Sequence, residues 1–118
     1  MKFLCIVYQD EKILNAMSKA ERQKLDNVSL DHDEALRKSG HYIHSNALQF
    51  AHTACTLRLK QGKVVVTDGP FAETREQVGG YILIEAKDMN EAIQLASKIP
   101  PLRLAGIEIR PVQELEHS

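Results

Sequence analysis

The stretch from Lys63 to Tyr81 constrains the fold of this chain more than any other part of the sequence. It opens with a run of three valines at positions 64–66, a pattern that is typical of β-strands. The run ends at Asp68-Gly69-Pro70, a strong turn signal, and a charged segment then leads to Gly79-Gly80 and a second apolar run. Two strands therefore meet here through a sharply turned connection, and we interpret the stretch as the joint of the fold.

Helix signals occur at two places. Ser18 and Glu21 fit a capping box, which predicts a helix over residues 19–39. Gly40 then stands where a left-handed C-cap belongs. A second capping pattern at Asp88 predicts a helix that ends before Pro100.

Strand patterns fill most of the remaining chain. Strands are expected at Phe3–Tyr8, His41–Leu48, Thr53–Leu59, Lys63–Thr67, Tyr81–Ala86 and Gly106–Val112. Residues 60–62 are expected to form a three-residue hairpin loop. Residues 9–17 are interpreted as a loop with a helical turn, and residues 71–78 as a polar segment with a helical turn.

This order of elements predicts a single α+β domain over residues 1–118, with the ferredoxin-like split βαβ arrangement. Both helices would cover one face of an antiparallel sheet. The strands Phe3–Tyr8 and Tyr81–Ala86 are apolar on both faces, so the second face also needs a cover. We therefore expect a homodimer with the two sheets packed face to face.

The composition excludes several classes of function. A net charge of −1 gives no electrostatic reason to expect nucleic acid or an anionic membrane as a partner. The apolar runs are shorter than the roughly 18–20 residues that a membrane span needs, and the N-terminal run is too short for a signal peptide. A cytoplasmic location is the default expectation, and Cys5 and Cys55 are expected to be buried free thiols.

The segment from Val66 to Glu76, followed by Gly79-Gly80-Tyr81 and Ile84-Glu85, resembles the signature of the DGPF group of YCII-related proteins. The resemblance is strong over residues 53–112 and looser before them. It implies a ferredoxin-like fold that dimerises into an α+β barrel. It also implies a suspected enzymatic activity through a His and an Asp in a cleft, or an accessory role, since related domains occur alone or beside sigma factors.

Asp68 and His32 are the candidate catalytic residues. Asp68 ends a strand, where a carboxylate can reach a cleft, but an Asp before Gly-Pro also forms turns through its own carboxylate. His32 lies on the apolar stripe of the first predicted helix, where it is either a hydrogen-bonded core residue or a general base oriented by Asp68.

Five further residues are candidates for ligand binding. They are Arg58, Glu73, Glu76, Tyr81 and Arg110. The two arginines interrupt apolar strands and could hold an anion bidentately, or pair with a nearby glutamate. The two glutamates either take part in a site or form a solvated surface, and the tyrosine lines a cavity or packs in the core.

The sequence predicts neither a metal nor a cofactor. His41 and His44 point to opposite faces of an extended segment, and nothing completes a ligand set with them. Two functions remain open: a small-molecule enzyme of lyase, isomerase or hydrolase type, and a non-catalytic module for ligand binding, protein interaction or dimerisation.

Overall fold

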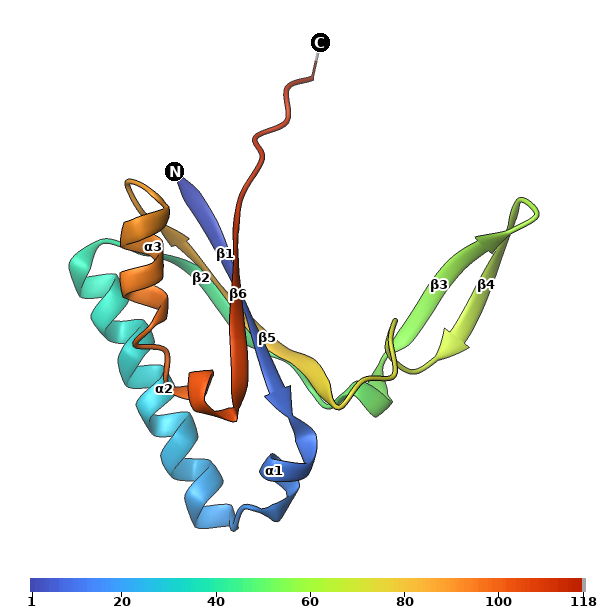
Figure 1. Ribbon diagram of the computed structural model, residues 1–118, viewed down its shortest axis with the longest axis horizontal. Helices are drawn as coiled ribbons and strands as arrows, with labels where there is room; N and C mark the ends of the chain where they lie inside the picture. The colour runs from blue at the N-terminus through green and yellow to red at the C-terminus, as the bar shows by residue number, and fades with distance from the viewer. Residues whose placement is uncertain (118) are drawn as a thin grey trace.

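The structure is a computed structural model, and it describes residues 1–117 (Figure 1). In chain order the elements are β1 (Lys2–Asp10), α1 (Glu11–Ala16), α2 (Lys19–Ser39), β2 (Tyr42–Ala47), the 3₁₀ turn η1 (Ala51–Thr53), β3 (Cys55–Lys60), β4 (Lys63–Asp68), β5 (Glu76–Glu85), α3 (Met89–Ala96), the 3₁₀ turn η2 (Pro100–Leu104) and β6 (Ala105–Pro111). Within the described chain, no helix combines the length and the apolar character that crossing a bilayer requires.

Four strands form the main sheet, in the order β2-β5-β1-β6, and every neighbouring pair is antiparallel. β1 is an inner strand, so that Cys5 lies opposite Ile82 on one side and Ile109 on the other. Helices α2 and α3 lie together on one side of the sheet (Figure 1). The expected α+β class with an antiparallel sheet is confirmed.

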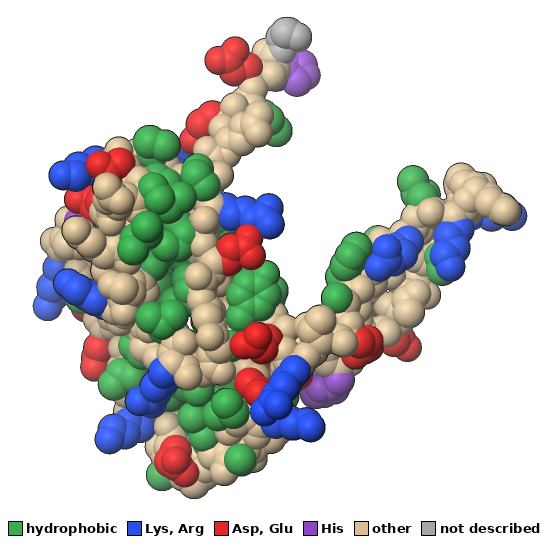
Figure 2. Space-filling view, viewed as in Figure 1, with side chains coloured by type: hydrophobic (Ala, Val, Ile, Leu, Met, Phe, Trp, Pro, Cys, Tyr) green, Lys and Arg blue, Asp and Glu red, His purple; other side chains and the backbone are tan. Residues whose placement is uncertain are grey.

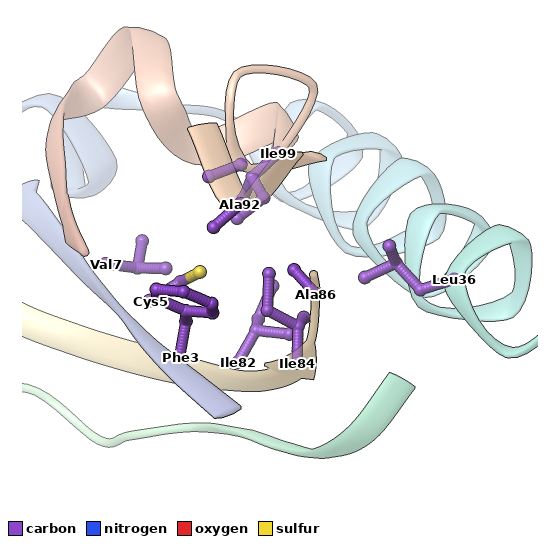
Figure 3. Packing of buried hydrophobic residues seen from close by; sticks show 10 residues of the cluster. Phe3, Cys5, Val7, Leu36, Ile82, Ile84, Ala86, Ala92 and Ile99 are labelled. Carbon is purple, nitrogen blue, oxygen red and sulfur yellow. The ribbon is translucent and has the colours of Figure 1, made fainter. Parts of the chain in front are cut away.

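The hydrophobic core lies between the sheet and these helices. β1 contributes every second residue to it: Phe3, Cys5 and Val7 are buried and point toward α3 and the segment after it (Figure 3). Burial raises the pKa of the Cys5 thiol to about 11, so this cysteine is an unreactive core residue. The alternate residues of β1 lie half-buried on the opposite face, which we call the open face of the sheet.

The helix ends follow from the local sequence. Ser18 Oγ accepts a hydrogen bond from the Glu21 backbone N–H at 3.1 Å, and the Glu21 carboxylate accepts one from the Ser18 N–H at 3.1 Å. Gly40 ends α2 in the left-handed conformation, with φ of 82°. Asp88 caps α3 through the Glu91 N–H. Both predicted helices are therefore confirmed.

The hairpin β3–β4 leaves the main sheet and forms a two-stranded sheet of its own, which we call the arm (Figure 1). Its turn has two residues and not the expected three, since β3 runs through Lys60 and β4 begins at Lys63. Gln61 and Gly62 both have positive φ, 52° and 77°, as in the tight turns whose twist matches a hairpin.

The helical turn expected within residues 9–17 is α1 at residues 11–16, because the Asp10 carboxylate caps it. Two other local predictions were wrong. Residues 71–78 contain no helical turn, because the Gln77 amide binds the carbonyls of Ala72 and Thr74 and leads the chain into β5. Cys55 is exposed, because it lies on the arm, which forms a two-stranded sheet of its own outside the main sheet and its core.

Candidate functional site

A hollow of about 540 Å³ opens where the arm leaves the body of the molecule. We call it the junction hollow, and it is lined by Tyr8, Asp10, Thr74, Arg75 and Glu76. Acidic and basic side chains gather at this position in the space-filling view (Figure 2). The strand register explains the meeting: Asp10 ends β1 directly opposite Glu76, the first residue of β5.

Asp10 is the centre of the hollow's polar wall. It is the one buried charged side chain among the described residues, at 5% exposure. Its carboxylate accepts a hydrogen bond from the Lys12 N–H at 3.0 Å and one from Arg75 Nε at 2.6 Å. The hydrogen bond from Arg75 is the main reason that the pKa of this carboxyl lies below its ordinary value.

Arg75 keeps donors free for a ligand. Its one recorded hydrogen bond within the described chain uses Nε, and its side chain is 72% exposed. The two terminal nitrogens of the guanidinium therefore remain available in a fixed plane. Such a fork matches the two oxygens of a carboxylate or phosphate.

A second polar row continues from the hollow along the open face. Tyr8 Oη donates to Glu108 Oε1 at 3.3 Å, and Glu108 in turn pairs with Arg110. The hydrogen bond from Arg110 lowers the pKa of Glu108. Arg110 is therefore already paired with a glutamate on its own strand, which was one of the two alternatives for this residue.

On the far side of the open face, Tyr81 joins β5 to the edge strand β2. Its hydroxyl lies 2.8 Å from His44 Nδ1 and accepts a hydrogen bond from Asn46 Nδ2 at 3.1 Å. The rings of Tyr81 and His44 stack with their centroids 5.8 Å apart. Tyr81 therefore belongs to a polar cluster at the surface and not to the hydrophobic core.

Asp68 and His32 are not brought together within one chain. Asp68 is the last residue of β4 on the arm, exposed and opposite Cys55, while His32 lies on α2 at the other side of the molecule (Figure 1). The Asp68 carboxylate neither lines the junction hollow nor makes a recorded hydrogen bond to its own turn in the described chain.

His32 is half-buried on α2, close to Leu95 of α3. Its Nδ1 is buried and has no hydrogen-bond partner among the described residues. Burial is the main cause that lowers the pKa of this imidazole. These surroundings agree only in part with the interpretation as a hydrogen-bonded core residue, because the side chain is half-buried; a hydrogen bond with the Leu95 backbone raises its pKa against the effect of burial.

The remaining candidate residues, Glu73, Glu76 and Arg58, do not lie at one site. Glu76 lines the junction hollow, whereas Glu73 is exposed outside it. Arg58 stacks over the Phe71 ring at 4.1 Å and donates to the Phe71 carbonyl at 3.4 Å, so it holds the segment after the arm. No group of three or more potential metal ligands is found in the part of the chain that the structure describes.

Sequence reasoning missed Asp10, the residue on which the hollow depends. One signal was present: an Asp at the end of an apolar strand and before a short helix-forming segment is a typical N-cap. Its partner Arg75 lies 65 residues further along the chain, and no local pattern connects the two.

Comparison with known proteins gives a consistent result. The family model of the YCII-related domain matches residues 1–116. An uncharacterised protein from Rhizobium meliloti (strain 1021) is 32% identical over 120 residues, which cover 95% of this chain and 92% of that protein.

Proposed function

Because the chain belongs to the YCII-related domain family, we propose that it is a homodimer that binds a small anionic molecule in the junction hollow. The single observation that carries this proposal is the Asp10–Arg75 pair. The buried Asp10 carboxylate holds the Arg75 guanidinium through Nε. Arg75 lines the junction hollow, and its two terminal nitrogens remain free to bind a ligand there. Fixing the side chain before binding reduces the entropy that a ligand must overcome.

The same pair favours binding over catalysis. A carboxylate that accepts a charged hydrogen bond is a weak base, because its proton affinity is reduced. The alternative function, an enzyme of lyase, isomerase or hydrolase type, would use Asp68 with His32. That pair makes no contact in one chain, so the non-catalytic function is the better supported of the two.

We place the chain in the DGPF group of the family, on the sequence from Asp68 to Phe71 and the strand that follows. The strand order β2-β5-β1-β6 agrees with a ferredoxin-like split βαβ fold. In this proposal the open faces of two copies meet and form an α+β barrel. The half-buried apolar residues of the open face would then be covered; they include Leu4, Ile6 and Leu83.

The arm supports the dimer. One of its faces carries Leu57 opposite Val66 and Leu59 opposite Val64, and each of these side chains is more than 60% exposed. Hydrophobic side chains follow the arm in the space-filling view (Figure 2). Contiguous exposed apolar surface of this kind is typical of an interaction site, and a second copy of the chain is the occupant that we propose.

A thermal-shift experiment with succinate, citrate and inorganic phosphate tests the hollow. We expect at least one of these anions to raise the unfolding temperature of the wild type in a saturable manner. Arg75→Lys keeps the charge but removes the planar fork, and should abolish the shift. Arg37→Lys is the matched control, because Arg37 is also ion-paired, to Glu34 at 3.2 Å, but lies on α2.

Two results would reject the binding site: no stabilisation by any of the three anions, or equal stabilisation of the wild type and Arg75→Lys. Loss of the shift in Asp68→Asn would instead favour the catalytic alternative. Sedimentation at micromolar concentration tests the dimer separately. A dimer that becomes a monomer in Leu57→Asp supports the role of the arm, and a monomeric wild type refutes it.

A further inference from the structure

A second hollow lies between the N-terminal half of α2 and the 3₁₀ turn η2, on the side of the sheet that the helices cover (Figure 1). We call it the α2 pocket, and its volume of about 350 Å³ is within the range that holds a small ligand. Its apolar lining consists of Met17, Leu25, Val28 and Pro100. Met17 and Leu25 also pack with Leu14 and Leu104 in a small hydrophobic cluster, so the pocket opens directly onto packed core.

The lining residues of α2 share one face of the helix because of their spacing. Glu21, Lys24, Leu25 and Val28 follow the i, i+3, i+4, i+7 pattern. The turn η2 supplies the opposite wall, with Pro100 at its start and Arg103 near its end. Leu25 is buried, whereas Lys24 and Arg103 are exposed, so the apolar lining extends below two basic side chains at the surface.

The charged groups of the α2 pocket favour an anion. Lys24 and Arg103 come from different elements, and neither belongs to an ion pair recorded among residues 1–117. The carboxylate in the lining, that of Glu21, already accepts a hydrogen bond from the Ser18 N–H at 3.1 Å. Two uncommitted cations against one engaged carboxylate give the pocket an excess of positive charge.

An apolar interior beside two cations suits an anion with an aliphatic chain. Methylene groups buried against Leu25 and Val28 supply affinity, since each fully buried methylene strengthens binding about fourfold. The carboxylate of such a molecule can accept hydrogen bonds from the Arg103 guanidinium and the Lys24 ammonium. A small, wholly polar anion would leave the apolar lining in water and gain much less.

The proposed dimer leaves the α2 pocket uncovered. In that dimer the open faces of two sheets meet and the arms provide the other contact, whereas α2 lies on the opposite side of the sheet (Figure 1). The residues that line the pocket are also different from those that line the junction hollow. A ligand in the α2 pocket would therefore bind independently of the dimer and of the site around Arg75.

We propose that the α2 pocket binds a medium-chain aliphatic carboxylate. Lys24 and Arg103 hold the carboxylate, and the chain lies against the apolar lining. This site is separate from the junction hollow and does not depend on it.

Octanoate is the probe, titrated into the whole chain and followed by calorimetry and by backbone amide NMR shifts. We expect saturable shifts at residues 21–28 and at Arg103. Affinity should rise more than about tenfold from butanoate to octanoate, even if only half of the added methylene groups are buried. Neutral octanol should bind about tenfold more weakly than octanoate, which is the effect of losing hydrogen bonds between charged groups.

Variants of exposed residues separate a carboxylate site from an apolar hollow bordered by solvated charges. Lys24→Gln combined with Arg103→Gln should weaken octanoate binding about tenfold and leave octanol binding unchanged. Lys19→Gln is the matched control, because it removes a lysine charge from the same helix outside the pocket. Val28→Asp places a carboxylate in the lining at a position that is already exposed, and should abolish octanoate binding. Thermal unfolding of each variant checks that it is folded.

Three outcomes would overturn the proposal. The first is the absence of saturable octanoate binding. The second is an affinity of the Lys24→Gln, Arg103→Gln variant within about twofold of the wild type, as expected for charges that only border the pocket in water. The third is a set of shifts that centres on Arg75 and is lost in Arg75→Lys.

Discussion

Two adjacent glycines in β5 offer a sharp test of how the sheet is packed. Gly79 and Gly80 are both buried, and each can be changed to Ala by adding one methyl group. At Gly80 the new Cβ would lie 2.8 Å from the Asn46 carbonyl oxygen and 3.3 Å from Ala47 Cα, both in the backbone of β2. At Gly79 it would collide with the amide group of Gln9, at the end of a flexible side chain.

The two substitutions should therefore differ in free energy, although the chemical change is identical. Backbone in a paired strand moves only by opening the pairing of β2 with β5, and overpacking of this kind costs about 1–3 kcal/mol. An unfolding entropy of about 2.1 cal/mol/K per residue makes 1 kcal/mol worth about 4 °C in a chain of 118 residues. Gly80→Ala should lower the unfolding temperature by about 4–12 °C.

Gly79→Ala should lose much less stability, because the Gln9 side chain can rotate away. In a Gln9→Ala background the clash disappears, and Gly79→Ala should then be neutral or stabilising by up to about 1 kcal/mol, since alanine restricts the unfolded chain. Urea unfolding of the four variants and the wild type measures these differences. The reasoning fails if the unfolding free energy of Gly80→Ala lies within about 0.5 kcal/mol of the wild type, which is roughly the scatter for neutral surface changes. It also fails if, in the Gln9→Ala background, Gly79→Ala costs as much stability as Gly80→Ala does.

Three further predictions follow from the core and from two shifted ionisable groups. Ile84 is 1% exposed, so Ile84→Ala should destabilise the fold by about 2–5 kcal/mol in urea unfolding, and a loss below 1 kcal/mol would contradict the packing described. The pKa of Asp10 is lowered from 3.8, so the unfolded chain binds more protons than the folded one, and stability should fall as the pH drops through the folded-state pKa. Asp10→Asn should flatten this pH dependence of stability between pH 5 and pH 2. An unchanged slope in Asp10→Asn would contradict a lowered pKa for Asp10. The pKa of His32 is lowered from 6.5, so the contribution of neutral His32 to folding stability is complete above that value and is lost as the pH falls below it. His32→Gln should flatten the profile of stability against pH between pH 7 and pH 5. A profile identical to that of the wild type would show that His32 has the same pKa in the folded and unfolded chain.

The parts of the fold that depend on local chemistry could be predicted from the sequence. The long helix is an example, because the capping residues Ser18 and Glu21 and the terminating Gly40 all lie within one turn of its ends. Most strands also followed from their apolar patterns, although β5 begins at Glu76 and not at Tyr81 as predicted. The two-sided apolar character of β1 predicted a cover for its second face, while its inner position between β5 and β6 came only from the structure.

The candidate site could not be predicted in the same way, because it depends on distant contacts. Asp10 meets Arg75 across 65 residues, and His44 meets Tyr81 across 37. The separation of the arm from the main sheet was missed for a similar reason. Alternation in residues 55–68 specifies a hairpin, but nothing in it specifies which sheet the hairpin joins.

The inner position of β1 has a consequence for how the chain folds during synthesis. β1 is made before both of its partner strands, β5 and β6: Tyr8 of β1 contacts Glu108 of β6 across 100 residues. The apolar residues of β1 therefore have no strand neighbours during the synthesis of α2 and the arm, which depend on local contacts. Since non-local pairings are slow to form, this waiting strand is the segment that chaperones or other nascent chains would meet. Only when β6 emerges can the sheet close on both sides of β1.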